Sequence, residues 1–169
     1  MKARIALLFL LGFFWSSANG QDLTLDQLIG VQKMGSLDKV NDYLLQRAWQ
    51  FDGAEPENGF TQVVWAFKVH SSSVGNAATL NVFFCESCEE GVSTILYRTY
   101  EKRYIDLIRK SAINYKMEAT TKVGTEAIST IYRGATYELR IIIEKAESGH
   151  RPAYDVELNK IQVMDASPR

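Results

Sequence analysis

The sequence contains few of the residues that would place it in a fibrous, disordered or strongly charged class. Among its 169 residues are two cysteines and three prolines, and 19 lysines and arginines nearly balance 20 aspartates and glutamates. The low proline count and the hydrophobic fraction of 46% exclude a collagen-like or disordered chain. The balanced charge argues against non-specific nucleic-acid binding, which requires a basic surplus. We therefore expect a globular chain that needs no cofactor to build its core.

Long apolar runs are missing except at the N-terminus. Two basic residues precede an apolar run at residues 5–15, and small residues follow as far as Gly20. The run is shorter than the ~20 residues that a membrane-spanning helix needs. This pattern predicts a signal peptide over residues 1–20, cleaved after Gly20 or after Ala18, with an uncleaved anchor as the alternative. The expected mature chain has no membrane span and is secreted or periplasmic, in an oxidising compartment.

Three segments have apolar residues at helical spacing. Thr24 and Gln27 form a capping-box pattern at the start of the first segment, and Gly35 can end it in a left-handed turn. Ser36 is placed to cap the second segment. The predicted helices cover residues 23–34, 36–48 and 101–112.

Alternation of apolar and polar residues predicts strands over the rest of the chain. The turns between the first three strands are too short for parallel crossovers, so these strands are predicted to form an antiparallel meander. The stretch DGAEPENG, residues 52–59, has the clearest turn chemistry and is predicted as a turn. The predicted strands cover residues 60–69, 78–85, 92–97, 125–133, 136–144 and 154–161, with a further strand near Tyr115.

The two halves of the chain follow the same order of elements. A shift of 64 residues aligns Ala48 with Ala112 and matches the apolar positions around them. The pattern predicts an N-terminal helix in residues 21–35, then two tandem helix-plus-four-strand units in residues 36–99 and 100–169. The expected fold class is α+β: one compact domain with a curved antiparallel sheet of about eight strands and helices on one face.

The segments SLDKVNDYLLQRAWQF and TQVVWAF, within residues 36–67, resemble known proteins. They are similar to uncharacterised secreted proteins of Gram-negative bacteria, which share an amphipathic helix, a Trp-x-Phe exit and a strand containing Trp-Ala-Phe. The tandem plan resembles the β-lactamase-inhibitory protein fold, and a single unit resembles the small outer-membrane assembly lipoproteins, although this chain lacks their lipidated cysteine. The last two groups are binders and not enzymes, but this resemblance is one of architecture, and a shared fold does not determine function.

Cys85 and Cys88 form the one motif with intrinsic reactivity. Two thiols at this spacing can close a small disulfide or act as a redox pair. Neighbouring glutamates disfavour the thiolate, so a structural disulfide is the favoured interpretation. A thiol/disulfide or metal-binding protein centred on this pair is an alternative. A metal would need further ligands, and the two imidazoles, His70 and His150, are not near the pair in sequence.

Candidate catalytic groups are few. The chain has no Gly-x-Ser-x-Gly motif, and two histidines leave few candidates for a general base. Asp52, Glu55 and Glu57 gather in the predicted turn, where carboxylates are usually solvated. We therefore predict no catalytic residue and no metal site, and a carboxylate-dependent hydrolase is kept as a second alternative.

The most informative surface is the second face of the predicted sheet. Glu138, Arg140 and Glu157 alternate with apolar residues, so they are expected to point away from the core. A solvated sheet face without a role is one interpretation. The other is a concave recognition surface, on which these charges select a partner and Phe83 adds apolar contact. We expect a non-enzymatic protein that binds another envelope or extracellular macromolecule.

Overall fold

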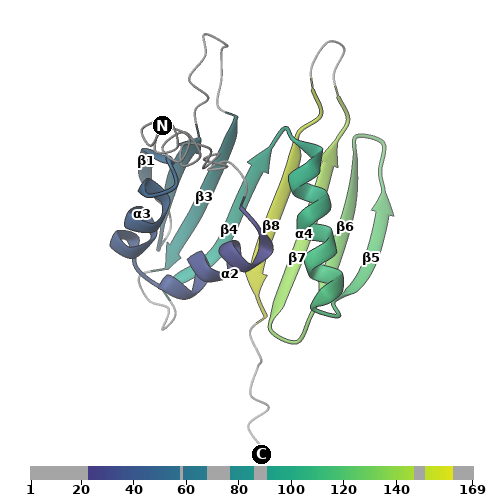
Figure 1. Ribbon diagram of the computed structural model, residues 1–169, viewed down its shortest axis with the longest axis horizontal. Coiled ribbons are helices and arrows are strands. Elements are labelled where there is room, and N and C mark those ends of the chain that lie inside the picture. The colour runs from purple at the N-terminus through teal and green to yellow at the C-terminus, as the bar shows by residue number, and fades with distance from the viewer. Residues whose placement is uncertain (1–22, 58, 68–76, 86–90, 147–150, 162–169) are drawn as a thin grey trace, which may run out of the picture.

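The computed structural model describes residues 23–57, 59–67, 77–85, 91–146 and 151–161 (Figure 1). The predicted signal peptide lies outside these residues. The described part contains three helices and one eight-stranded antiparallel sheet on which the helices pack. The expected α+β class is therefore confirmed.

The helices are α2 (Leu25–Met34), α3 (Leu37–Leu45) and α4 (Lys102–Asn114). The predicted capping box of α2 is confirmed, because the Thr24 hydroxyl accepts from the Gln27 N–H at 3.3 Å and the Gln27 side chain accepts from the Thr24 N–H at 2.8 Å. Gly35 ends α2 with φ at 67°, as expected. Ser36 stands at the N-cap of α3 but makes no side-chain capping hydrogen bond, so that prediction was wrong. None of these helices is long and apolar enough to cross a membrane.

All neighbouring strands of the sheet are antiparallel, in the order β1-β2-β3-β4-β8-β7-β6-β5. Each half of the chain contributes a four-stranded meander, and the two meanders join where β4 pairs with β8. The strands are β1 (Gln50–Glu57), β2 (Phe60–Phe67), β3 (Ala78–Cys85), β4 (Val92–Thr99), β5 (Glu118–Val123), β6 (Ala127–Arg133), β7 (Tyr137–Glu144) and β8 (Tyr154–Lys160).

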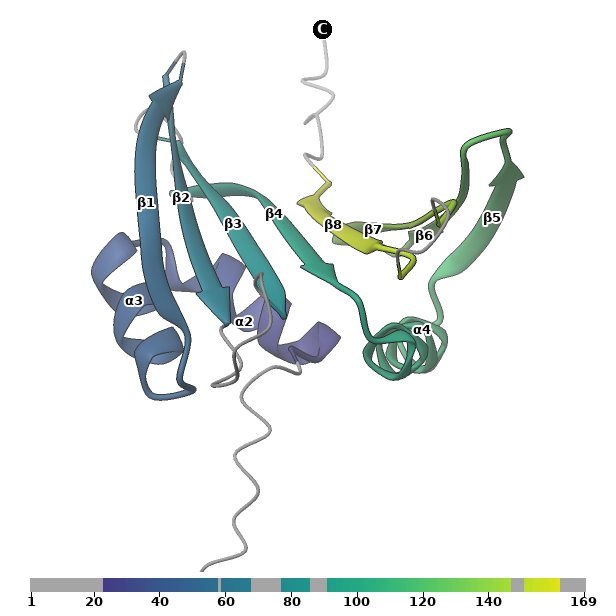
Figure 2. The ribbon, with the colours of Figure 1, turned by 90° about the horizontal axis from the view of Figure 1, so that it is seen from above.

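The sheet is strongly curved, and the helices lie on its convex side (Figure 2). Helices α2 and α3 cover the half formed by β1 to β4, and α4 covers the other half (Figures 1 and 2). The opposite side of the sheet forms a trough, which we call the concave face. No described helix lies over it.

The core fills the space between the helices and the convex side of the sheet. Its largest fully buried side chains include Trp49, Trp65 and Tyr97. The Trp65 indole N–H donates to the Asn41 side-chain oxygen at 3.2 Å, so burial leaves this donor satisfied. From α4, Ile105 and Ile108 reach the same core and are also fully buried. Each large apolar side chain contributes roughly 1.5–3 kcal/mol by leaving water.

The predicted turn at residues 52–59 was wrong, because residues 50–57 form the edge strand β1. Within the described residues β2 is the only strand beside it, so Pro56 is tolerated, and a register shift between Phe51 and Gly53 accommodates the glycine. The strand expected near Tyr115 begins three residues later, as β5 at Glu118.

The 64-residue alignment of the two halves was also wrong at the helix ends. Both α3 and α4 lead into a strand through a residue with positive φ, Ala48 at 61° and Lys116 at 55°. The next N–H donates back to the helix in each case, from Trp49 to Leu44 and from Met117 to Ala112, both at 3.1 Å. The ends of α3 and α4 therefore correspond after a shift of 68 residues instead of 64. The apolar pattern of a helix nearly repeats after one turn, so a slip of four residues preserves it.

Candidate binding face

The strand register defines which side chains lie on the concave face. One row of directly opposed residues crosses it from β2 to β6, comprising Val64, Asn81, Leu96, Glu157, Arg140 and Ile131. A second row comprises Gln62, Phe83, Thr94, Asn159, Glu138 and Arg133. Within these two rows the residues of β2 to β4 are neutral and partly apolar, whereas the charged residues all lie on β8, β7 and β6.

Arg98 of β4 organises the first group of charges. Its Nε and Nη2 donate to the two carboxylate oxygens of Asp155 at 2.6 and 2.7 Å, and Nη2 also donates to Glu144 at 3.0 Å. The bond to Asp155 is the main reason that the pKa of Arg98 is raised above its ordinary value. A two-pronged guanidinium–carboxylate contact fixes direction as well as distance. The three side chains are 43%, 25% and 46% exposed, so they are held in place and still reach solvent.

Arg140 of β7 organises the second group. It lies between Glu157, at 3.4 Å from Nη1, and Glu138, at 4.0 Å from Nη2. Arg133 of β6 donates to Glu138 from its other side. The amide of Asn159 donates to Glu157 at 2.8 Å, which fixes the orientation of that carboxylate. The arrangement alternates cations and anions across three adjacent strands.

The neutral side chains that β2 to β4 place on the face are ordered by polar contacts. The Gln62 amide donates to Asn81 at 3.0 Å, and the Thr94 hydroxyl donates to Asn159 at 2.8 Å, which links the two halves. Phe83 and Leu96 are partly exposed beside these groups. The concave face therefore combines apolar contact area with fixed charges.

The structure brings three of the four predicted partner-binding residues together. Arg140 lies in salt-bridge distance of both Glu138 and Glu157, as described above. Phe83 shares their face, but β4 and β8 separate its strand from β7. Because neighbouring strands lie ~4.8 Å apart, Phe83 is roughly 14 Å from Glu138 across the sheet.

Arg98 is the residue that sequence reasoning missed. The predicted strand ended at Tyr97, two residues before the observed end of β4 at Thr99. Arg98 continues the alternation, because it points to the other side of the sheet from the buried Tyr97 and Thr99. Its partners Asp155 and Glu144 are distant in sequence, 57 and 46 positions further along the chain. Extending the period-two pattern to Thr99 would have placed Arg98 on the charged face.

The two cysteines are only partly described. Cys85 is buried at the end of β3, with 6% of its surface exposed, and it is not a free thiol. Cys88 lies outside the described residues, as do His70 and His150. The pairing of Cys85 with Cys88 and the alternative thiol or metal functions therefore stay predictions.

Carboxylates do not gather into a metal site within the described residues. Asp52 and Glu55 lie on the exposed edge strand β1, beside a small hollow of about 250 Å³ that Gln62 and Val64 also line. The side chain of Glu57, the third acid of this group, is not described. The hydrolase alternative likewise stays a prediction.

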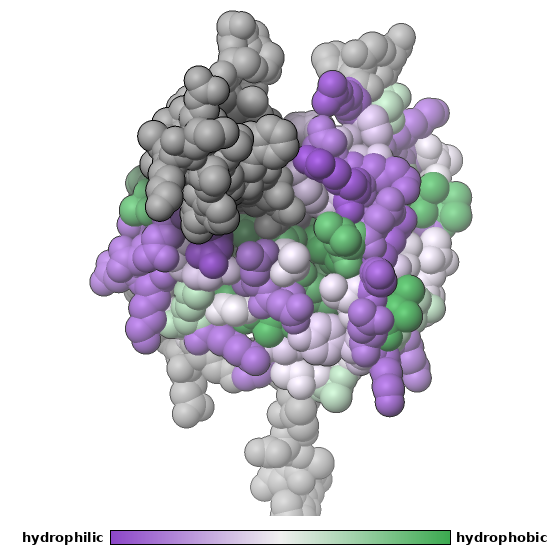
Figure 3. Space-filling view, in the orientation of Figure 1, coloured by the Kyte–Doolittle hydropathy of each residue, from purple (hydrophilic) through white to green (hydrophobic). Residues whose placement is uncertain are grey.

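The helix side of the molecule carries a separate pocket of about 240 Å³. It opens between α2, the end of α4 and the turn from β6 to β7, and Leu25, Met117 and Tyr137 are among its lining residues. The Tyr115 hydroxyl donates to Asp26 beside it and links α4 to α2. Elsewhere on this side, hydrophilic side chains run along the outside of α4 (Figure 3).

Comparison with protein-family models, curated proteins and solved structures finds no match to this chain. The resemblance of residues 36–67 to secreted proteins of Gram-negative bacteria therefore stays a prediction.

Proposed function

We propose that this chain is a secreted or periplasmic, non-enzymatic binding protein that holds another macromolecule on its concave face. The observation that carries the proposal is the order of the charges on that face. Arg98 and Arg140 are each held by two carboxylates, so their positions are set before a partner arrives. Preorganised side chains reduce the entropy that association costs.

The composition of the face supports a protein partner. Arginine and aromatic residues are enriched at the energetic centres of protein interfaces, and Arg140 and Phe83 lie on one continuous surface. The face also extends across strands from both halves of the chain, which suits a macromolecule better than a small ligand enclosed in a cavity.

Capture with reversible cross-linking tests the proposal. The unaltered protein is compared, in its own envelope or culture fraction, with the triple variant Glu138→Lys, Arg140→Glu and Glu157→Lys. Reversing all three signs preserves the attraction of position 140 for its two neighbours, removes the exposed ion pair of Arg133 with Glu138, and inverts the charge pattern that a partner meets. The variant is therefore expected to fold and to lose the partner.

A matched control exchanges the charges of a salt bridge on the helix side. Lys102 and Asp106 form an i,i+4 pair at 2.6 Å on the outside of α4, so Lys102→Glu with Asp106→Lys changes a remote surface. The proposal expects this variant to retain the partner. Retention by the concave-face variant, or equal loss from both variants, would contradict it.

A further inference from the structure

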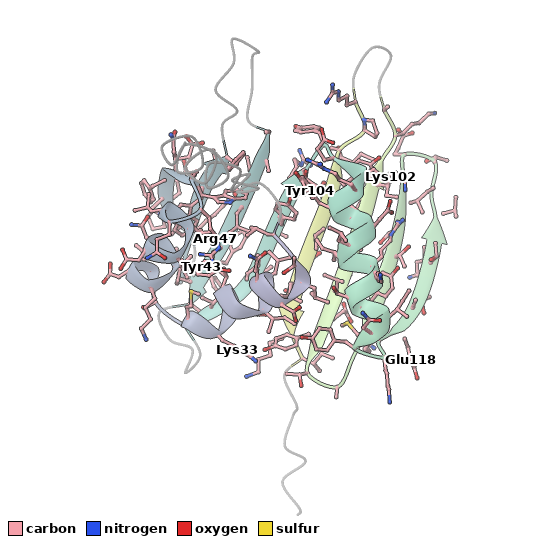
Figure 4. The ribbon with its side chains drawn as sticks, viewed as in Figure 1. Lys33, Tyr43, Arg47, Lys102, Tyr104 and Glu118 are labelled. Atoms are coloured by element: carbon pink, nitrogen blue, oxygen red, sulfur yellow. The ribbon has the colours of Figure 1, made fainter. Side chains whose placement is uncertain are left out.

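The second edge of the sheet, β5, is unusually open. Among the strands that the structure describes it pairs only with β6, and all six of its residues are exposed. The strand curves away from α4 at the margin of the molecule (Figure 2), with Glu118 at its start (Figure 4). The outer side of an edge strand presents backbone N–H and C=O groups that can pair with another strand.

The opposite edge, β1, carries features that oppose such pairing. Pro56 lacks a backbone donor, the register shift between Phe51 and Gly53 interrupts the ladder, and Asp52 and Glu55 repel a second acidic edge. Strand β5 has neither a proline nor a register shift. This asymmetry indicates that β5 is the edge free to take another strand.

The charges of β5 are complementary to those of a second, antiparallel copy. Glu118, Thr120 and Lys122 share the concave face. Neither Glu118 nor Lys122 forms a salt bridge with another residue in the part of the chain that the structure describes. A two-fold axis at Thr120 would bring Glu118 opposite Lys122 of the second copy, and would do so twice by symmetry.

The same register also covers apolar surface. Val123, which is 78% exposed, would lie opposite Met117 of the second copy, on the convex side of the sheet. Val123 already faces Ile128 of β6, which is 41% exposed, so an apolar row would continue from one copy into the other. An axis at Thr121 would instead oppose Lys122 to Thr120 of the second copy and lose both ion pairs.

We propose that the protein forms a symmetric homodimer through antiparallel pairing of its β5 strands, with the axis at Thr120. Each eight-stranded sheet then continues into the other. Two six-residue strands bury less than the ~1,600 Å² of a standard stable interface. The dimer is therefore weak and depends on protein concentration.

Sedimentation equilibrium of two single variants and their mixture tests this inference. Glu118→Lys leaves only cations on the pairing face, and Lys122→Glu leaves only anions, so each variant opposes like charges in its own dimer. Each is expected to raise the dimer dissociation constant at least about tenfold, which is about 1.4 kcal/mol. An equimolar mixture restores two opposite-charge pairs and should form a heterodimer about as tight as the original dimer.

Glu55→Lys on β1 is the matched control, because it makes the same charge change as Glu118→Lys on the other edge. It should leave the dissociation constant unchanged. Amide hydrogen exchange of the unaltered protein gives a second measurement that needs no variant: protection of residues 118–123 should rise with protein concentration. A monomer at all concentrations, variants that dimerise as the original does, or a monomeric mixture would overturn the inference.

Discussion

Gly91, which directly precedes β4, is expected to tolerate no side chain. Its φ is 71°, in the left-handed region, and a Cβ added there would lie 2.1 Å from the carbonyl oxygen of Gly35 and 2.9 Å from the carbonyl carbon. Left-handed backbone costs a residue with a Cβ about 1–2 kcal/mol. Relief of the overlap must move backbone, and overpacking typically costs about 1–3 kcal/mol. Gly91→Ala should therefore lower the unfolding free energy by roughly 2–5 kcal/mol.

Two other glycines separate these causes. Gly59 has φ at 85° but no atom within 4 Å of an added Cβ, so Gly59→Ala should cost only the conformational part, about 1–2 kcal/mol. Gly53 has neither a positive φ nor a close neighbour, and Gly53→Ala should be neutral or stabilise the protein by up to about 1 kcal/mol.

Thermal unfolding followed by circular dichroism measures the series. About 2–4 °C of melting temperature per kcal/mol is typical for a protein of this size, so Gly91→Ala should melt roughly 4–20 °C lower. Gly53→Ala should have the highest melting temperature of the three variants, Gly59→Ala an intermediate one and Gly91→Ala the lowest. A Gly91→Ala protein that melts together with Gly59→Ala would refute the close contact between Gly35 and Gly91.

Three further predictions concern the core, a tyrosine and the cysteines. Ile108→Ala removes a fully buried side chain of α4 and should cost about 2–5 kcal/mol in chemical denaturation; a cost below about 1 kcal/mol would contradict the assigned core. The hydrogen bond to Asp26 is the main cause that raises the pKa of Tyr115 above its ordinary value of 10.0, so its stabilisation is complete below pH 10 and is lost as pH rises through the raised pKa. In an ultraviolet titration, Tyr115→Phe should therefore lack one of the tyrosines that ionise at the highest pH in the unaltered protein. An unchanged titration at high pH would contradict the contact of Tyr115 with Asp26. Cys85→Ser with Cys88→Ser should leave a folded protein that is about 2 kcal/mol less stable, whereas loss of function with unchanged melting would favour a thiol role.

The sequence contains the local information for most of the fold. The period-two pattern of residues 136–144 and 154–161 predicted β7 and β8 and the side on which Arg140 lies, because alternation in a strand directly reports its two environments. The capping box of α2 was also predictable, because Thr24 and Gln27 are close in sequence as well as in space.

Edge position and register are the features that the sequence does not contain locally. An edge strand needs backbone partners on one side only, so β1 forms from residues with turn chemistry, including Pro56. The contact between Arg98 and Asp155 depends on how β4 pairs with β8 at the junction of the two halves. That pairing is decided by the packing of the whole sheet, so the contact of Arg98 with Asp155 could not be predicted from the sequence.

Photo-cross-linking in the native compartment tests the central claim most directly. A photoreactive amino acid replaces Leu96, at the middle of the concave face, or Leu107, which is 49% exposed on α4. Mass spectrometry then identifies what each position captures. The account predicts a specific macromolecular adduct from position 96 and none from position 107. An adduct from position 107 alone would contradict the assignment of the concave face as the binding surface.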